Sequence, residues 1–477
     1  MQLNYIANTA VASSSGKTIP VIDPSDGQVF DEIQRSNASD IDTAVSAARD
    51  CLELVWQRQS AAERGRLLMR LSVKVAQYAD ELALIEQRDC GKPVKQARAD
   101  VAALVRYFEF YAGACDKFHG ETIPYQNGYS VMTWREPHGV TGHIIPWNYP
   151  MQIFGRSVGG ALAAGNVCVV KPAENACLSL LRVAQLAAEV GFPAGAINIV
   201  TGYGHEVGDA LARHKGIDHI SFTGSPTVGT LIQQVAAERH CPVTLELGGK
   251  SPQVVFADAD LDAAIPTIVN AIVQNAGQTC SAGSRLLVEQ SIYEPLLDRL
   301  GQAFEKLRVG PASMDLDVGP LISQIQQQRV WDFLSDAQVA NISMVAQGQI
   351  VDEAPDTGFY QAPTLLRDVP VMHRLAQEEV FGPVLCAMSF KDEDHAAQLA
   401  NATPFGLVAG IWTRDGARQF RMAKRIKSGQ VFINNYGAGS GVELPFGGVK
   451  SSGSGREKGF EALYGFTTLK TIAIHHG

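Results

Sequence analysis

Cys280 is the residue from which a chemical interpretation of the sequence can start. It lies among small, turn-prone residues, Gly277-Gln278-Thr279-Cys280-Ser281-Ala282-Gly283, directly after an apolar helical pattern. This setting favours a sulfur that faces a cleft, so Cys280 is a candidate nucleophile. A thiol needs a neighbour that lowers its pKa or removes its proton, and Glu246 stands in a similar setting, Glu246-Leu247-Gly248-Gly249-Lys250. The alternative is a small buried hydrophobic residue, as most lone cysteines are.

The other cysteines lack such a setting. The chain has eight, scattered singly, with no C-x-x-C pair and no histidines at the spacing of metal ligands. This pattern predicts reduced, mostly structural thiols and no metal site. Cys168 lies in the apolar run Val167-Cys168-Val169-Val170, whereas Cys280 has polar and glycine neighbours. The contrast singles out Cys280.

Seven motifs in a fixed order give the sequence a family resemblance. They are Pro146-Trp147-Asn148-Tyr149-Pro150, Lys171-Pro172-Ala173-Glu174, Phe222-Thr223-Gly224-Ser225, Glu246-Leu247-Gly248-Gly249-Lys250, Gly277-Gln278-Thr279-Cys280, Glu378-Glu379-Val380-Phe381-Gly382-Pro383 and Pro445-Phe446-Gly447-Gly448. Together they resemble the NAD(P)-dependent aldehyde dehydrogenase superfamily, in its hydrolytic form that does not acylate coenzyme A. The resemblance implies oxidation of an aldehyde to a carboxylic acid through a thiohemiacetal and a cysteine thioester, which water then hydrolyses.

Three residues are expected to be catalytic. Cys280 would attack the aldehyde, and the Asn148 side chain and the Cys280 backbone N–H would donate hydrogen bonds to the resulting alkoxide. Glu246 would be the general base that activates the hydrolytic water, and relatives that acylate coenzyme A tend to lack a glutamate at this place. On its own, an asparagine between two prolines is most often a turn residue. Glu457 resembles a supporting residue near the active site.

Cofactor-binding residues are expected where strands end in small-residue turns. The turn Phe222–Ser225 opens a helical pattern, and the free N–H groups of a helix N-terminus suit a pyrophosphate. Lys171 and Glu174 resemble an adenosine-ribose clamp, although in isolation they would be a surface ion pair. Because a carboxylate there accepts hydrogen bonds from a hydroxyl and repels a phosphate, NAD is predicted in preference to NADP. The residues expected to bind NAD are Ile145, Pro146, Trp147, Lys171, Glu174, Gly204, Phe222, Gly224, Ser225, Leu247, Gly248, Glu379 and Phe381.

The substrate is expected to be an aromatic or otherwise bulky aldehyde. Arg156 follows Asn148 by eight residues, so it can line a substrate channel if that helix faces it. Arginine there resembles two groups of the family, those that oxidise semialdehydes of dicarboxylic acids and those that oxidise aromatic aldehydes. Arg156 could instead pair with an acid such as Glu443 or turn to solvent. The expected substrate residues are Tyr149, Arg156 and Phe446. The apolar walls that favour the aromatic group are Tyr149, Phe154, Tyr436 and Phe446.

The fold is predicted to be α/β and aldehyde-dehydrogenase-like. Short apolar runs alternate with helical patterns from residue 140 to 238, and the same alternation begins again after Lys250. This pattern is typical of doubly wound parallel sheets. We therefore expect two such domains and a small β arm, with Glu246 and Cys280 in the cleft between the domains. The expected boundaries are 1–118 and 138–248 for an NAD-binding domain, 249–448 for a catalytic domain, and 119–137 with 464–477 for an oligomerisation arm that the resemblance implies.

Local patterns give more detailed expectations. Residues 1–20 are polar and Ser-rich, and Val21-Ile22-Asp23-Pro24 with Asp26-Gly27 predict a strand and a turn. Asp40 can cap a helix that follows it. Helices are expected around 61–88 and 97–117, and residues 310–330 are expected to be loop-rich. The dipeptide Asn127-Gly128 predicts a hairpin turn.

Composition excludes several classes of protein. The net charge is −9 and no cluster of lysine and arginine stands out, which argues against a nucleic-acid partner. The N-terminus lacks a secretory signal and no apolar stretch reaches membrane-spanning length, so a cytoplasmic location without a membrane partner is expected. The expected partners are a small aldehyde and further copies of the chain in a homodimer or homotetramer. A catalytically silent structural relative is the alternative, although Cys280, Glu246 and Asn148 are all present.

Overall fold

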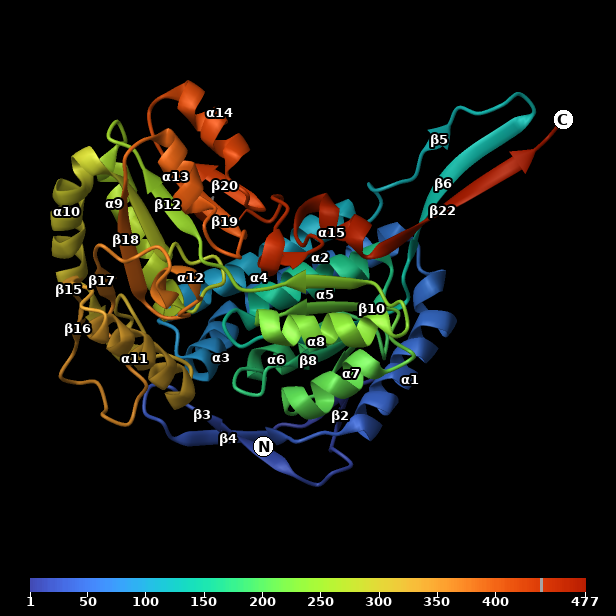
Figure 1. The fold of residues 1–477 in the computed structure, drawn as a ribbon. Coiled ribbons are helices and arrows are strands. Elements are labelled where there is room, and N and C mark those ends of the chain that lie inside the picture. Colours follow the sequence, from blue (N-terminus) through green and yellow to red (C-terminus); the bar gives the residue numbers. More distant parts are fainter. Residues whose placement is uncertain (438–440) are drawn as a thin grey trace.

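Two large sheets with helices on their faces form the body of the protein in this computed structural model, which describes residues 1–437 and 441–477 (Figure 1). A third, small sheet projects from the body and carries the C-terminus. The parallel strands in the middle of the large sheets are buried on both faces, which explains the apolar runs in several of them. The predicted α/β class, with two parallel-sheet units and a small β arm, is confirmed.

The first sheet has the strand order β2-β1-β9-β8-β7-β10-β11-β21 in the described residues. Its five middle strands are parallel, and β1, β2 and β21 are antiparallel additions at its edges. The strands are β1 Asn4–Ile6, β2 Thr9–Val11, β7 Val140–Ile145, β8 Val167–Pro172, β9 Ile197–Ile199, β10 His219–Thr223, β11 Val243–Glu246 and β21 Gly453–Ser454. The helices that connect its middle strands are α5 Pro150–Ala164, α6 Leu178–Glu189, α7 Asp209–Arg213 and α8 Pro226–Ala237.

The carboxyl ends of four middle strands lie level with one another. Ile144 pairs with Lys171 on one side and with Phe222 on the other, and Phe222 pairs with Leu245. Each strand ends one residue beyond this row, so the loops that follow begin at the same edge of the sheet. Ligands bind at this edge in open parallel sheets.

The second sheet has the order β15-β17-β18-β13-β12-β19-β20 in the described residues, and only β15 runs antiparallel to its neighbour. All its strands fall inside the segment 249–448, although the domain limits themselves stay a prediction. Its strands are β12 Pro252–Val255, β13 Arg285–Glu289, β15 Met344–Gln347, β17 Thr364–Leu366, β18 Val384–Phe390, β19 Val408–Trp412 and β20 Gln430–Ile433. Its helices are α9 Leu261–Val273, α10 Tyr293–Glu305, α11 Gln324–Val339, α12 Arg374–Gln377, α13 Glu393–Ala400 and α14 Gly416–Arg425. Helix α11 begins inside the stretch that was expected to be loop.

The N-terminal segment differs from expectation. Residues 1–20, for which the polar sequence predicts no strand, contain β1, which is buried and pairs with β9 through Tyr5 and Ile199. Asn37, not Asp40, is the N-cap of α1 Ala38–Leu54, and the Asp40 carboxylate accepts a hydrogen bond from the Asn37 backbone N–H at 2.9 Å. The capping box formed by Asn37 and Asp40 is visible in the sequence. Strand β1 was not predicted because it lies in a polar, Ser-rich stretch.

A helical layer precedes the first motif. The segment 61–88 forms two helices because Tyr78 leaves the helical conformation with φ −105° and ψ 21°. The helices of this layer are α2 Ala61–Gln77, α3 Ala79–Cys90 and α4 Val94–Ala114. Helix α4 packs against both α2 and α5, so it lies beneath the loop that follows β7.

The projecting sheet contains the predicted hairpin. Strand β5 Thr122–Ile123 pairs with β6 Tyr129–Pro137, and Gly128 adopts φ +82° between them. The longer partner of β6 is the C-terminal strand β22 Thr467–His475, which pairs with it along its whole length. Figure 1 shows this sheet reaching away from the body. The remaining elements are β3 Thr18–Ile22, β4 Val29–Gln34, β14 Arg308–Val309, β16 Gln349–Ile350 and α15 Gly459–Gly465.

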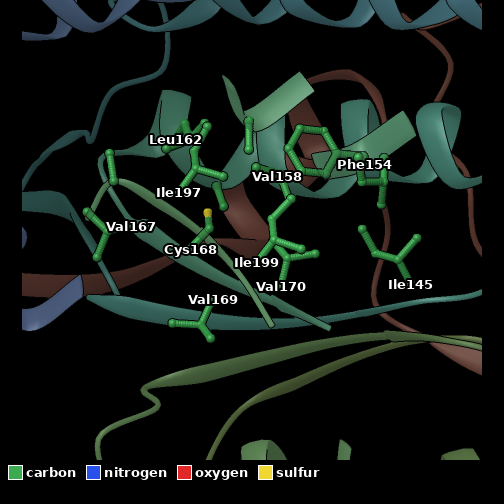
Figure 2. Close-up of a cluster of buried hydrophobic side chains, with 14 of the residues drawn as sticks. Ile145, Phe154, Val158, Leu162, Val167, Cys168, Val169, Val170, Ile197 and Ile199 are labelled. Atoms are coloured by element: carbon green, nitrogen blue, oxygen red, sulfur yellow. The ribbon is translucent and has the colours of Figure 1, made fainter. Parts of the chain in front are cut away.

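The core of the first unit lies between α5 and the sheet. Figure 2 shows Phe154, Val158 and Leu162 among the side chains of β8 and β9. Phe154 is fully buried, so the expectation that it forms a channel wall is wrong. It points away from Arg156 because residues two apart on an α-helix face nearly opposite sides. No helix in the described part of the chain is both long and apolar enough to cross a membrane.

Candidate active site

The loop that carries Cys280 has an uncommon backbone. Asn275, Ala276 and Gly277 follow α9 with φ of 49°, 54° and 74°. Such angles cost a non-glycine residue about 1 kcal/mol or more, so they persist only where the surroundings impose them. Gly277 is required here, because a β-carbon would overlap the backbone of Gly382. The loop is therefore built to hold Cys280 in one place.

Asn148 is tied to the Cys280 loop by two hydrogen bonds. Its Nδ2 donates to the Gln278 carbonyl at 3.0 Å, and Asn275 Nδ2 donates to the Asn148 carbonyl at 2.8 Å. The other N–H of the Asn148 amide has no partner among the described residues. A buried, fixed and partly free donor is what an alkoxide site needs.

Cys280 and Asn148 each line two cavities, of about 290 Å³ and about 600 Å³. All eight cysteines fall within the described residues and are free, and Cys280 alone is partly exposed whereas the other seven are buried. A thiol shared by two cavities can meet one molecule from each.

The smaller cavity brings together the expected substrate residues. Its walls include all three, and the expected wall residue Tyr436 as well. It is lined by side chains of α4, α5, α9, the Cys280 loop and the segment 430–458. The apolar and aromatic members are Tyr149, Ile153, Val408, Phe432, Tyr436, Leu444 and Phe446.

The larger cavity brings together eight of the expected cofactor residues. They are Pro146, Trp147, Gly224, Ser225, Leu247, Gly248, Glu379 and Phe381. Ile145 is the last residue of β7 and Phe222 the last but one of β10, the strands beside it. Lys171 and Glu174 form an ion pair of 2.9 Å next to Gly204. These three residues do not line the larger cavity but lie at the same edge of the sheet.

The larger cavity fits a dinucleotide. Ser225 caps α8, and its Oγ accepts a hydrogen bond from the Val228 N–H. Because Pro226 has no N–H, the Thr227 N–H is the donor of the first turn that is left for an anion. Thr223 Oγ is buried without a hydrogen-bond partner in the described structure. A β-carbon at Gly248 would overlap the Glu379 carboxylate, so glycine keeps this wall open.

Two residues of α11 hold the loop that presents Glu379 and Phe381. Gln326 Nε2 donates to the Phe381 carbonyl at 2.7 Å, and Arg329 Nη2 donates to the Glu379 carbonyl at 2.6 Å. Phe381 has φ +59° and its ring meets that of Trp147 edge-on at 5.3 Å. Neither polar residue was predicted to act here, although their spacing of three is a helical signal inside the stretch expected to be loop.

Burial raises the pKa of both reactive groups. The Glu246 carboxyl is 1% exposed, neither oxygen has a hydrogen-bond partner among the described residues, and burial followed by the nearby Glu457 raises its pKa well above the usual value. Burial raises the pKa of the Cys280 thiol to about 11, and the Arg156 guanidinium is the main opposing influence. A raised pKa favours the protonated carboxyl, which becomes a base only after losing that proton.

Arg156 pairs with Glu457, not with Glu443 or solvent. The Arg156 and Glu457 side chains form a buried ion pair, and Arg156 lies 4.9 Å from the centre of the Phe446 ring. Ser221 Oγ donates to the other Glu457 oxygen at 3.1 Å. Glu443 instead pairs with Arg106 at 2.7 Å, because both lie at the exposed rim. Arg156 still lines the smaller cavity.

A buried cluster behind Tyr149 was not predicted. Lys92 is fully buried, contacts both Glu86 and Asp100, and lies 4.3 Å from the centre of the Tyr149 ring. The Tyr149 hydroxyl is 2.8 Å from Thr279 Oγ, the residue before Cys280. The cluster therefore braces a wall of the smaller cavity and the Cys280 loop. A lysine in a helix-to-helix turn carries no sequence signal for burial.

Comparisons with known proteins all lead to the same family. A sequence profile described as "Aldehyde dehydrogenase family" matches residues 10–472. The hydroxyisobutyraldehyde dehydrogenase of Mycolicibacterium austroafricanum is 43% identical over 99% of this chain and 94% of its own. A crystal structure from Burkholderia cenocepacia, provisionally assigned as an aldehyde dehydrogenase, superposes with a TM-score of 0.99 at 72% identity over both whole chains. The NAD⁺ complex of a Bacillus cereus aldehyde dehydrogenase superposes with a TM-score of 0.97 at 37% identity, covering 100% of this chain and 97% of that one.

Proposed function

The chain belongs to the aldehyde dehydrogenase family and is an oxidoreductase, and we propose that it oxidises an aromatic or otherwise bulky aldehyde to its carboxylic acid with NAD as the hydride acceptor. The observation that carries this proposal is the position of Cys280, which borders both cavities. The aldehyde would occupy the smaller cavity and the dinucleotide the larger one.

Each catalytic residue has a separate task. The Cys280 thiolate adds to the carbonyl carbon, and the free N–H of Asn148 and the Cys280 backbone N–H stabilise the alkoxide; the loss of one such donor costs about 3–4 kcal/mol in comparable sites. After the thioester has formed, Glu246 removes a proton from the attacking water. Its raised pKa makes it a stronger base than an exposed glutamate once it is ionised.

The dinucleotide would be held along the carboxyl edge of the first sheet. Ser225 and the α8 N-terminus would take the pyrophosphate, Lys171 and Glu174 the adenosine ribose, and Glu379 the other ribose. Bound there, NAD would supply the hydride acceptor for the aldehyde carbon. The Glu174 carboxylate supports a preference for NAD, because it would repel the extra phosphate of NADP.

The shape and charge of the smaller cavity support the aromatic substrate. Seven aromatic or branched aliphatic residues line it, and the charge of Arg156 is balanced by Glu457. One observation favours a second candidate, a semialdehyde of a dicarboxylic acid. Arg156 Nη2 is buried without a hydrogen-bond partner in the described residues, so it could donate a hydrogen bond to the distal carboxylate of such a substrate.

The test is the formation of reduced nicotinamide from a panel of aldehydes. Wild type should reduce NAD with benzaldehyde-type substrates and should have a higher specificity constant with NAD than with NADP. The Cys280→Ala variant is the control and should give no signal. A wild-type protein that reduces NAD with none of the aldehydes would overturn the proposal. This is the result that a catalytically silent relative would give.

We also propose that the projecting sheet joins copies of the chain into a homodimer or homotetramer. Strand β22 forms one edge of that sheet in the described residues, and Leu469 and Ile474 on it are exposed apolar side chains. Removal of residues 464–477 should lower the mass measured by light scattering to that of one chain.

A further inference from the structure

Three charged side chains line the smaller cavity in the described structure: Asp100, Arg156 and Lys458. The thiol of Cys280 adds no charge at neutral pH, since burial raises its pKa to about 11. The balance of these three groups therefore decides what charge a substrate meets beside the reactive sulfur.

Two of the three charges are compensated. Asp100 contacts the buried Lys92 amine and accepts a hydrogen bond from Gln152 Nε2 at 2.6 Å. The second acid at Lys92 is Glu86, and burial raises the pKa of its carboxyl. Arg156 is balanced by Glu457.

Lys458 is the uncompensated group. No carboxylate lies within ion-pairing distance of its amine among the described residues. Its Nζ instead lies 5.2 Å from the centre of the Phe446 ring and 5.8 Å from that of Tyr107. A cation held over aromatic faces keeps its charge available to a further ligand.

The backbone holds Lys458 in this position at a cost. Its φ of 61° and ψ of 164° lie in a region that essentially only glycine occupies. Neighbours on both sides fix these angles: Phe446 and Glu457 exchange backbone hydrogen bonds of 2.7 and 2.8 Å, and the Gly459 N–H donates to the Val442 carbonyl at 2.9 Å. Strain that is kept at a cavity wall points to a use for the side chain.

We propose that Lys458 is a specificity-determining residue that selects aromatic aldehydes with an anionic substituent, such as a carboxylate, at the ring position away from the aldehyde. The inference rests on the proposed function and narrows its substrate class. The ring would lie between the aromatic walls, and the ammonium group would receive the anion. The same charge would disfavour cationic aldehydes.

The test compares three aldehydes whose para positions differ in charge: benzaldehyde, para-carboxybenzaldehyde and para-(trimethylammonio)benzaldehyde. Steady-state kinetics are measured for wild type, Lys458→Met, Lys458→Arg and the control Lys424→Met, which removes an exposed lysine of α14. The methionine variant should raise KM for the carboxylated aldehyde about 10-fold to 100-fold, the usual range for a lost hydrogen bond to a charged group. Its KM for benzaldehyde should change little, and KM for the cationic aldehyde should fall.

The arginine and control variants sharpen the result. Lys458→Arg should keep the preference for the carboxylated aldehyde, and Lys424→Met should match wild type. An unchanged ratio of the carboxylated to the neutral substrate in Lys458→Met, or an equal loss with both, overturns the inference. Turnover of benzaldehyde by wild type without any charge preference also overturns the inference and leaves the proposed function standing. Absence of turnover with every aldehyde overturns the proposed function itself.

Discussion

The backbone at Gly249 lies directly against the backbone carbonyl of Cys280, so closely that a β-carbon at position 249 would overlap that oxygen. Gly249 follows β11 by three residues, and its N–H donates to Glu379 Oε1 at 3.0 Å. The loop that begins at Glu246 is therefore in contact with both the Cys280 loop and the Glu379 loop. This contact fixes the base, the nucleophile and one wall of the larger cavity relative to one another.

Gly249→Ala should therefore damage activity more than stability. The added methyl group must displace the Cys280 carbonyl, and a misplacement of about 1 Å at a reacting group can cost about 100-fold in rate. The overlap should lower the free energy of unfolding by about 1–3 kcal/mol. Aldehyde turnover and urea unfolding measure the two effects. Gly113→Ala is the matched control, since nothing lies within 4 Å of its β-carbon and it should be neutral or slightly stabilising. Equal behaviour of the two variants would contradict the backbone contact.

Glu246→Gln should slow thioester hydrolysis about 100-fold or more, the usual contribution of a general base. An initial burst of reduced cofactor should remain, because acylation needs only Cys280 and Asn148. The pH dependence adds a second measurement. Since burial raises the pKa of Glu246, its ionised form grows at higher pH than that of an exposed glutamate, and the steady-state rate of wild type should rise with it. In the glutamine variant this rise should be absent. Loss of the burst together with the steady rate would give Glu246 a role in activating the thiol.

The sequence predicted the middle of both sheets because parallel, buried strands leave continuous apolar runs that alternate with helical patterns. It also placed Cys280, Asn148 and Glu246 in turns, where glycine and proline leave a local signal. Strand β1 and the start of α11 were missed, since their polar residues are paired by partners far away in the chain. The burial of Lys92 and the pairing of Arg156 with Glu457 were not predicted for a similar reason. A charge is buried only where the fold brings an opposite charge near it.

Glu379 predicts a pH dependence of cofactor binding. Burial raises its pKa to about 7, so the carboxylate that would accept hydrogen bonds from a ribose is lost as pH falls through neutral. The dissociation constant for NAD, measured by quenching of protein fluorescence, should therefore increase from pH 8 to pH 6, the span around that pKa. Glu379→Gln should bind NAD more weakly than wild type at pH 8 and should show little change with pH. A wild-type affinity that is constant over this span would remove Glu379 from the cofactor site.

Arg156→Leu should act mainly on stability. It leaves the fully buried Glu457 without its counter-charge, and breaking a buried pair in this way costs about 3–5 kcal/mol. Replacing both partners, Arg156→Leu with Glu457→Leu, should recover much of that loss because no buried charge remains. Urea unfolding of the single and double variants measures this. A single variant that is as stable as wild type and loses activity only with carboxylated aldehydes would show that Arg156 binds the substrate anion, in favour of the dicarboxylic semialdehyde.

Lys458→Gly should be more stable than Lys458→Ala, although glycine normally lowers stability. Both variants remove the amine, so the comparison isolates the backbone. At φ 61° and ψ 164°, alanine keeps the strain of a side chain in a glycine region, which costs about 1–3 kcal/mol, whereas glycine relieves it. Even after the entropic cost of glycine, about 0.5–1 kcal/mol, a net gain of about 1 kcal/mol remains. Thermal and urea unfolding should show this difference, and both variants should lose the preference for carboxylated aldehydes. A glycine variant that is less stable than the alanine variant would show that position 458 is relaxed, and the lysine would then need no function to explain its conformation.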